Sequence, residues 1–198
     1  MLRLTPISLR SPFVTLSPLD QAHCDDLSEA VQDGALWQLW YTTIAKPELM
    51  RQEIDRRLAL KAAGSQLPFA VIANASGRAV GMTSYLNIDA PNRRLEIGAT
   101  WYRKSLQRTQ LNTQCKMLLL AHAFEDLDCI AVEFRTHYFN HASRRAIERL
   151  GAKLDGILRN HQITPSGTLR DTCVFSIIAA EWPTVKAHLA FELAKPRS

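Results

Sequence analysis

The sequence has few cysteines, and their spacing does not match a metal site. Its four cysteines, Cys24, Cys115, Cys129 and Cys173, lie far apart, with no CxxC pair and no paired cysteine and histidine spacing. We therefore predict no metal site. Cys129 and Cys173 lie in apolar runs and are predicted to be buried thiols. Free thiols are typical of a reducing compartment, so we expect a cytoplasmic protein.

Long apolar runs are also missing. No stretch reaches the roughly 18 apolar residues that a membrane helix needs. The segment MLRLTPISLRSPFV lacks the apolar core of a signal peptide. Internal repeats, low-complexity segments and linkers are absent as well. We therefore expect one domain over residues 1–198 and no membrane partner.

The excess of positive charge is small. Lys and Arg total 24 against 19 Asp and Glu, a formal charge of +5. This excess fits an anionic small ligand or simple solubility, whereas nucleic-acid binding usually needs a stronger basic stripe. We predict no nucleic-acid partner. The alternative, nucleic-acid binding through the basic segments, predicts an affinity that falls steeply with salt.

Apolar periodicity predicts an α/β fold with a mixed, mostly antiparallel sheet flanked by helices. Ser17 is the expected N-cap of the first helix, and Asn140 and Gly151 are expected to start and stop a later one. The expected strands cover residues 8–19, 68–74, 79–88, 94–102, 129–137 and a final hairpin over 152–178, and the expected helices cover 17–33, 46–64, 109–127, 140–151 and 181–193.

The segment YRKSLQRTQLNTQCK, residues 102–116, has no glycine or proline, although the chain must reverse there between a strand and a helix. The first N–H groups of a helix lack partners, and the positive end of its dipole favours anions. Lys104, Arg108, Thr109 and Asn112 could add side-chain donors. The alternative is a helix capped by Thr109 behind a solvated basic loop.

A second strand leads into a helix at THYFNHASRRAIERLGAKLDG, with Asn140 at the cap and Ser143 three residues later. If the two preceding strands are neighbours, the two helix starts lie close together and could share an anion. The alternative is an ordinary solvated helix face. The basic residues that suggest an anion are Arg93, Arg94, Arg103, Lys104, Arg108, Arg144, Arg145 and Arg149.

The order of elements, the segment EIGATWY with the loop and helix after it, and the pattern N-x-x-S-R-x-A-I-E-R-L-G-A together resemble the GNAT acetyltransferases. The similarity is greatest to the RimJ/RimL-like branch, which modifies the N-termini of ribosomal proteins. It spans nearly the whole chain and includes the later segments L-R-x-H and R-D-T. The resemblance implies a fold with splayed central strands.

The resemblance also implies an acetyl-CoA site. The pantetheine would pair with the strand that holds residues 97–102, the diphosphate would lie at the loop and helix start, and the second helix would face the thioester. The cofactor-binding residues implied in this way are Thr100, Trp101, Tyr102, Arg108, Thr109, Gln110, Asn112, Thr113, Asn140, Ser143 and Arg144.

The loop departs from the family's pattern Q/R-x-x-G-x-G/A. In the alignment, the two glycines fall on Arg108 and Gln110, and a small residue falls on Asn112. We expect a phosphate-binding loop in which Arg108, Thr109 and Asn112 do what bare backbone does in relatives.

Acetyl transfer to an amine needs a base, a polarised thioester carbonyl and a stabilised thiolate. The resemblance implies Glu96 as the catalytic base and a backbone N–H of its strand as the polarising donor. Alternatively, Glu96 only pairs with Arg94 or Arg135. The tyrosine acid of many relatives is replaced by Ile147, so Ser143 is the implied catalytic partner of the sulfur, with Tyr138 as a weaker candidate.

Two histidines and one aromatic cluster remain open. His137 follows a strand and His161 precedes the last turn, so either could relay a proton; structural roles are the alternative. Trp37, Trp40 and Tyr41 could line the acceptor site or pack in a core or a dimer.

The favoured function is transfer of acetyl from acetyl-CoA to a primary amine: a protein or peptide N-terminus, an amino acid, or a small amine. The alternative is a CoA-thioester sensor that has lost turnover. We also expect a homodimer.

Overall fold

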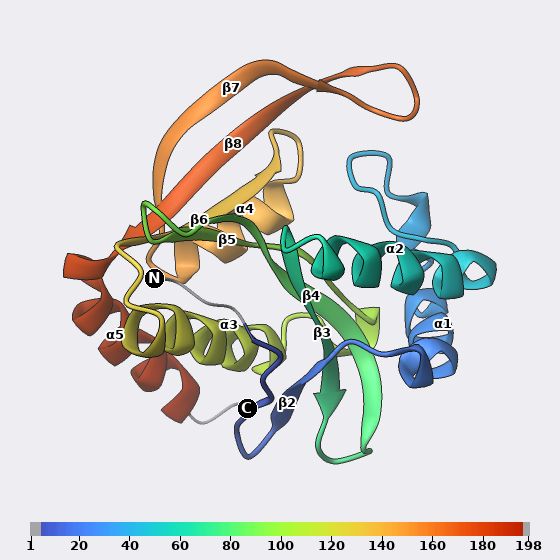
Figure 1. Ribbon diagram of the computed structural model, residues 1–198, viewed down its shortest axis with the longest axis horizontal. Helices are drawn as coiled ribbons and strands as arrows, with labels where there is room; N and C mark the ends of the chain where they lie inside the picture. The colour runs from blue at the N-terminus through green and yellow to red at the C-terminus, as the bar shows by residue number, and fades with distance from the viewer. Residues whose placement is uncertain (1–4, 196–198) are drawn as a thin grey trace.

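The computed structural model describes residues 5–195, built on one eight-stranded sheet. The strand order is β1-β2-β3-β4-β5-β6-β8-β7, and every neighbouring pair is antiparallel except β5 and β6, which are parallel (Figure 1). The mixed, mostly antiparallel sheet is therefore confirmed. The strands are β1 Leu9–Arg10, β2 Val14–Pro18, β3 Gln66–Ala73, β4 Arg78–Asp89, β5 Arg94–Tyr102, β6 Ala131–His137, β7 Lys153–Ile163 and β8 Leu169–Ile178.

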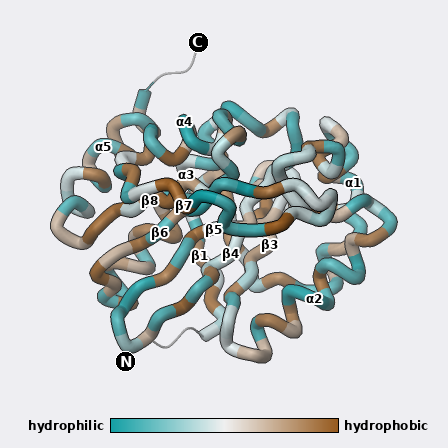
Figure 2. The backbone as a smooth tube through the Cα atoms, turned by 90° about the horizontal axis from the view of Figure 1, so that it is seen from above, coloured by the Kyte–Doolittle hydropathy of each residue, from teal (hydrophilic) through white to brown (hydrophobic). Residues whose placement is uncertain are grey.

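Helices cover both faces of the sheet, but unequally. Figure 2 shows α2 on one side of the strands and α4 and α5 on the other. The helices are α1 Cys24–Gln32, α2 Met50–Ala62, α3 Leu111–Ala121, α4 His141–Arg149 and α5 Trp182–Ala194.

Each face has its own hydrophobic core. One core joins the strands to α3, α4 and α5 and contains the fully buried Leu119 and Leu120. The other joins β3 and β4 to α1 and α2 and contains Met50 and Ile54, the residues whose spacing predicted α2. This second core includes Trp101 of β5 but no residue of β6, β8 or β7, so among residues 5–195 that part of the second face has no helix packed on it.

The predicted signals around α4 are confirmed. The Asn140 side chain accepts a hydrogen bond from the Ser143 N–H at 3.1 Å, which satisfies one of the free donors of the first turn. The helix ends at Arg149, and Gly151 follows with φ +96°, a conformation that glycine adopts at little cost.

Two predictions near the N-terminus are wrong. Ser17 does not cap a helix, because it lies in β2 and pairs with Ala70 of β3. Asp20 is the cap instead: its side chain accepts from the Ala22 N–H at 2.9 Å ahead of a short 3₁₀ turn, and α1 begins at Cys24. The single strand expected over residues 8–19 is two short strands, β1 and β2.

The helix expected over residues 109–127 begins at Leu111 and stays α-helical to Ala121. It then continues as a π-helical turn over His122–Asp126. All four cysteines are free and buried, as predicted for Cys129 and Cys173. No helix within residues 5–195 is long and apolar enough to span a membrane.

The long hairpin of β7 and β8 projects beyond the body of the molecule (Figure 1). Below it, on the face without a helix, lies a groove of about 510 Å³. The groove is lined by charged and apolar side chains of β5, β6, β7 and β8, among them Arg94, Glu133, Arg135, Asp155, Ser176 and Ile178.

Candidate active site

The two parallel central strands separate part of the way along the sheet. They pair from Arg94 with Ala131 to Glu96 with Glu133, and no further pairs follow. On the side facing β6, residues 97–102 of β5 therefore have backbone groups without a strand partner. Unpaired strand edges readily accept an extended ligand. The splayed central strands implied by the resemblance are thus present.

Strand β5 also carries a bulge within this unpaired segment. Gly98 pairs with Ser84 and Trp101 with Met82, so β5 has one residue more than β4 between these pairs. The extra residue is accommodated at Ala99, whose φ is +48°. A bulge turns backbone groups away from the regular ladder, which frees them for other partners.

The side chains after the bulge face inward. Trp101 is buried in the core beneath α1 and α2, and Tyr102 in the core beneath α3. Any contact that these two residues make with a ligand is therefore through the backbone. Thr100 is half-buried, and its hydroxyl lies 2.8 Å from that of Thr83 on β4.

In the glycine-free loop, Arg108 adopts the backbone conformation of a glycine. Its φ is +62°, in the left-handed region, at the position that aligns with a family glycine. Thr109 acts locally: its hydroxyl donates to the Leu106 carbonyl at 2.7 Å and accepts from the Leu111 N–H at 3.2 Å. Gln110 donates to the Leu193 carbonyl of α5 at 3.2 Å. The side chains of Thr109 and Gln110 therefore make structural hydrogen bonds, and those of Thr109 favour the alternative in which it caps the start of the helix.

The start of α3 keeps free donors. Among residues 5–195, the backbone N–H groups of Asn112 and Thr113 have no hydrogen-bond acceptor, and the Asn112 amide group is free as well. With the positive end of the helix dipole, these donors form a site for an anion. The free backbone donors are compatible with the predicted anion site, which stays a prediction.

The end of α1 anchors this loop. Asp33 accepts from Arg103 Nε at 3.1 Å and from the N–H and hydroxyl of Ser105 at 3.1 and 2.6 Å. These hydrogen bonds, first those of Ser105 and then that of Arg103, lower the pKa of Asp33. Gly34 makes the approach possible, since a Cβ there would lie 2.6 Å from the Cβ of Lys104.

The expectation that arginines surround the anion site is wrong for Arg93 and Arg94. Arg93 pairs with Asp128, and Arg94 with Glu133 at 2.5 Å, both at the far end of the nine-residue strand β5. That end is roughly 26 Å from Tyr102 at about 3.3 Å per residue. Arg103 is paired with Asp33, and Arg145 and Arg149 are exposed on α4.

The start of α4 differs from that of α3. The N–H groups of His141, Ser143 and Arg144 donate to oxygens of Phe139 and Asn140 in the preceding turn, so little free donor capacity remains. The guanidinium of Arg144 stacks on the Tyr138 ring and donates to the Tyr138 carbonyl at 3.2 Å. The Ser143 hydroxyl is half-buried and has no partner among the described residues.

Glu96 lies at the last pair before the strands separate. It is 6% exposed and accepts from Asn87 Nδ2 at 2.7 Å, with Arg135 Nε at 3.7 Å. Burial raises the pKa of Glu96, although Asn87 and Arg135 both oppose the shift. The pairing with Arg135 considered above is present, but it does not cancel the effect of burial. A raised carboxyl pKa is typical of a group that exchanges protons near neutral pH.

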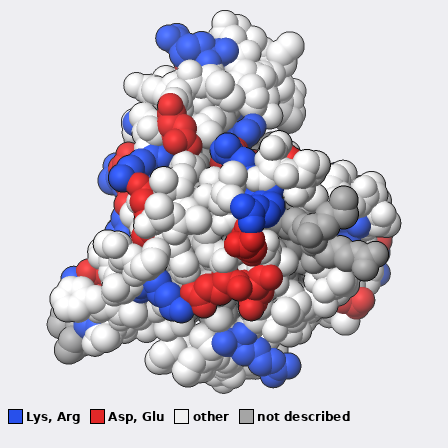
Figure 3. Space-filling model, turned by 60° about the vertical axis from the view of Figure 1, so that its left-hand side comes forward, with Lys and Arg blue, Asp and Glu red and all other residues white. Residues whose placement is uncertain are grey.

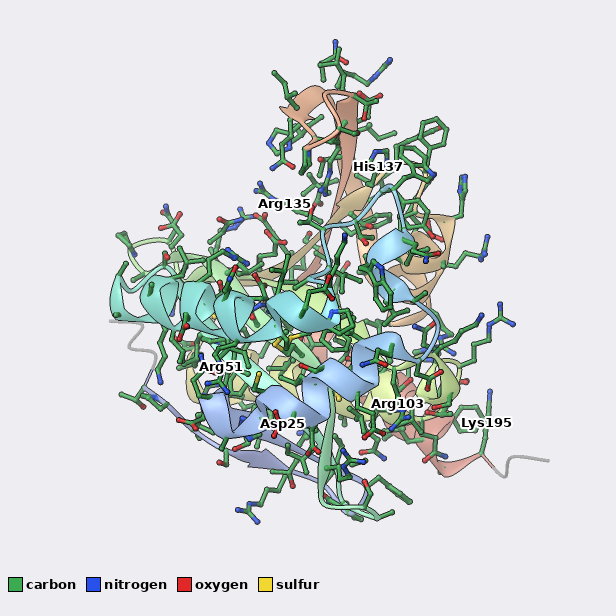
Figure 4. The ribbon with its side chains drawn as sticks, turned by 90° about the vertical axis from the view of Figure 1, so that its right-hand side faces the viewer. Asp25, Arg51, Arg103, Arg135, His137 and Lys195 are labelled. Atoms are coloured by element: carbon green, nitrogen blue, oxygen red, sulfur yellow. The ribbon has the colours of Figure 1, made fainter. Side chains whose placement is uncertain are left out.

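His137 meets the aromatic residues predicted to line the acceptor site. Its ring lies 5.1 Å from Trp40 and 6.5 Å from Tyr41, edge-on or tilted. Figure 4 shows His137 near the loop that joins α1 and α2. Its Nδ1 accepts the Phe139 N–H at 3.1 Å, and its Nε2 is buried without a partner. Burial and Arg170 lower the pKa of His137, so the neutral ring carries its proton on Nε2 and is a donor, not a base.

The other candidates have structural surroundings. His161 is exposed on the hairpin, 3.1 Å from the Thr172 hydroxyl. Ile147, which replaces the family tyrosine, is buried in the core. Sequence reasoning missed Arg57 and Lys116, two buried cations on either side of the β5 bulge. A signal was available for Lys116, because it lies within the apolar run CKMLLLA.

Comparisons with known proteins agree with this geometry. A model of the acetyltransferase (GNAT) domain matches residues 14–153. YdaF, a Bacillus subtilis protein with a provisional assignment as a ribosomal N-acetyltransferase, is 31% identical over 106 residues. That match covers 54% of this chain and 57% of YdaF, so the chain spans little more than half the length of this relative.

Solved structures match over much more of the chain. A GCN5-related N-acetyltransferase from Brucella melitensis has a TM-score of 0.86 and 30% identity, covering 96% of this chain and 87% of that one. The ribosomal-protein α-N-acetyltransferase RimL, solved with coenzyme A, has a TM-score of 0.73 and 19% identity, covering 87% and 98%, and shares the fold. Since the family model spans most of the sequence and the central strands separate as in that fold, this chain belongs to the GNAT acetyltransferases, which use acetyl-CoA.

Proposed function

We propose that this protein transfers the acetyl group of acetyl-CoA to the primary amine of a protein or peptide N-terminus. The observation that carries the proposal is the separation of β5 and β6 after Glu96. It leaves an unpaired strand edge over residues 97–102 that leads to the free N–H groups of Asn112 and Thr113. An extended pantetheine arm fits the edge, and a diphosphate fits the helix start.

The residues around the bulge fit the requirements of acyl transfer. The acetyl thioester supplies the activated carbonyl, and an N–H of β5 near Ala99 polarises it. Glu96 would take one proton of the acceptor ammonium, and the amine would form the C–N bond as the C–S bond breaks. The nitrogen would release a second proton as the amide forms, and the leaving thiolate would take up that proton near the Ser143 hydroxyl. Glu96 and Ser143 are the proposed catalytic residues. Bound cofactor also lies against Thr100, the backbone of Trp101 and Tyr102, the Arg108 backbone, and the helix starts at Asn112 and Asn140.

The acceptor is proposed to enter on the face of Glu96. That face carries the 510 Å³ groove of mixed charge and the exposed rings of Trp40 and Phe139, 60% and 55% exposed. When Trp40 turns aside, the Nε2–H of His137 can donate to a carbonyl oxygen. A peptide N-terminus has such a carbonyl beside its amine, and a simple alkylamine does not. The names of YdaF and RimL point the same way.

The test is thiol release from acetyl-CoA with a panel of amines. We expect turnover with peptides that have a free N-terminus, and much slower turnover with alkylamines of equal charge. Equal rates for both would contradict the peptide assignment but not acetyl transfer. Saturable CoA binding with no turnover on any amine would favour the sensor. The support for this alternative is Ile147, a buried residue at the position of the usual tyrosine acid.

The nucleic-acid alternative has little support on the face shown in Figure 3. There, Lys and Arg alternate with Asp and Glu and form no continuous basic stripe. We further propose a cytoplasmic homodimer. The four free thiols support the cytoplasmic location. The apolar side chains exposed on the projecting hairpin, such as Ile163 and Leu169, support the dimer.

A further inference from the structure

Lys116 is a buried cation beneath the proposed cofactor site. It is 5% exposed, and its ammonium donates to the Thr100 hydroxyl at 2.8 Å and reaches the Thr83 hydroxyl at 3.4 Å. Both threonines lie beside the bulge of β5. An ammonium has three N–H donors, so two hydroxyls do not satisfy it completely.

No carboxylate within residues 5–195 lies within ion-pair distance of Lys116. Arg57, on the opposite side of the bulge, shows the usual arrangement. It donates to the Ala99 carbonyl at 3.3 Å, and its charge is balanced by Glu53 at 2.6 Å. A buried charge without a counter-charge is costly. Lys116 therefore lacks the anion that Arg57 has.

The helix geometry indicates where that anion belongs. Lys116 is four residues after Asn112, so the two lie on one face of α3. Side chains on a helix point back toward its N-terminus, which brings the ammonium toward the first turn and the free N–H groups of Asn112 and Thr113. The ammonium itself lies at the hydroxyls of Thr83 and Thr100, beside the bulge of β5 and on the same face of α3 as Asn112.

We propose that Lys116 is a positioning residue of the cofactor site, and that its buried ammonium supplies the counter-charge for the diphosphate of CoA. The inference rests on the proposed function, because the diphosphate must lie at the start of α3. It also accounts for the loop without glycines. In relatives, glycines let the backbone N–H groups of the loop come close to the diphosphate, whereas here the buried Lys116 adds positive charge. Binding of CoA and protonation of Lys116 are therefore linked.

The surroundings of Lys116 make this linkage measurable. Burial lowers its pKa to about 8. The titratable group beside it is Cys115, whose pKa burial raises to about 12. Tyr102 lies next to Cys115, and burial raises the Tyr102 pKa well above its ordinary value, so both groups are neutral. From β4 and β5, the hydroxyls of Thr83 and Thr100 accept the hydrogen bonds of the ammonium. A bound anion raises the Lys116 pKa, so CoA binding takes up a proton near pH 8 and none near pH 6, where the amine is already charged.

The experiment is calorimetric titration of the full chain with CoA at pH 8 in buffers of different ionisation enthalpy. The phosphate monoester of CoA is already fully ionised there, because its second pKa is near 6. Wild type should take up as much as about half a proton per CoA. Lys116→Met should lose this uptake and bind CoA about tenfold more weakly, by loss of one nearby charge.

Two controls separate charge from structure. Lys61→Met removes the same charge from α2, at a half-buried site away from the bulge, and should leave CoA affinity and proton uptake unchanged. The apo Lys116→Met protein should melt at the wild-type temperature or above, because methionine fills the space without a buried charge. Dephospho-CoA keeps the diphosphate, so Lys116→Met should weaken its binding equally.

Several results would overturn the inference. Wild-type CoA affinity in Lys116→Met with unchanged proton uptake would do so while leaving the acetyltransferase proposal intact. An effect of the variant on CoA but not on dephospho-CoA would assign the charge to the 3′-phosphate instead. If wild type itself fails to bind CoA, both the inference and the cofactor site fall.

Discussion

At the scale of single residues, Glu96 combines two properties that are usually separate. It is buried like a structural group, yet it belongs to the last residue pair before the central strands separate, where we propose that the acceptor amine binds. Because burial raises its pKa, ionisation of Glu96 costs stability as the pH rises above the ordinary carboxyl range. A catalytic role and a structural role therefore predict opposite effects on stability.

For Glu96→Gln we predict a fall in kcat of at least about 100-fold, the usual contribution of a general base. The rising acidic limb of the pH–rate profile should vanish. The melting temperature at neutral pH should stay the same or rise, because the amide carries no buried charge. If Glu96→Gln keeps its activity, or loses activity only because it unfolds, Glu96 is a structural partner of Asn87 and Arg135 and not a base.

Arg108 shows backbone strain retained at a loop. An L-residue in the left-handed region costs about 1–2 kcal/mol, and glycine avoids this cost. We predict that Arg108→Gly is more stable than Arg108→Ala by about 1 kcal/mol, the reverse of their order in a helix. Both variants lose the same side chain, so comparing their denaturant unfolding isolates the backbone. A more stable alanine variant would show that φ at position 108 is not positive in solution.

At the scale of elements, the end of α1 fixes the loop that leads into α3. Asp33 accepts three hydrogen bonds from Arg103 and Ser105, and the Lys104 N–H donates to its carbonyl at 3.1 Å. Two helices distant in sequence are thereby held in one arrangement across the proposed diphosphate site. Mobility of the loop should therefore depend on one carboxylate of α1.

We predict that Asp33→Ala lowers stability by about 1 kcal/mol, as expected for surface hydrogen bonds to a charge that water partly replaces. CoA binding should weaken as well. Since the folded-state pKa of Asp33 is lowered, its contribution is present above the ordinary carboxyl pKa and disappears as the pH falls through the lower, folded value. Urea unfolding at pH 7 and pH 3 measures the loss of stability and its dependence on pH. Unchanged CoA affinity in the variant would mean that the loop holds its shape without α1.

At the scale of the whole molecule, the hairpin of β7 and β8 stands apart from the two cores. Every residue of β7 except the glycine is exposed, and Ile163 and Leu169 are 75% and 59% exposed. An exposed apolar edge strand invites pairing with another chain. This feature supports the proposed homodimer.

Light scattering after gel filtration should give twice the mass of one chain for the wild type. Ile163→Lys, on the projecting hairpin, should give a single-chain mass with unchanged helical circular dichroism. The matched control is Phe191→Lys, which replaces an apolar side chain of α5 that is 64% exposed, and this variant should remain dimeric. If the wild type has the mass of a single chain at all concentrations, the proposed homodimer is wrong.

Much of the fold could be predicted from the sequence because its signals are local. Apolar spacing identified α2 through Met50 and Ile54, the Asn140 cap and Gly151 bounded α4, and the family alignment placed a glycine where Arg108 adopts a glycine conformation. Each of these depends on residues within a few positions of each other. Ser17 shows the limit, since pairing with Ala70, distant in sequence, overrode a good capping signal.

The site depended on contacts that no local pattern contains. Pairing between β5 and β6 decided where the strands separate, and so placed Glu96 at that point. Distant carboxylates, Asp33, Asp128 and Glu133, decided that Arg103, Arg93 and Arg94 are paired. The sequence determined which segments become helices and strands, because those preferences arise within one or two turns of chain. Only the tertiary structure decided which charges are balanced and which, like that of Lys116, are buried without a carboxylate among residues 5–195, because charge balance depends on what packs nearby.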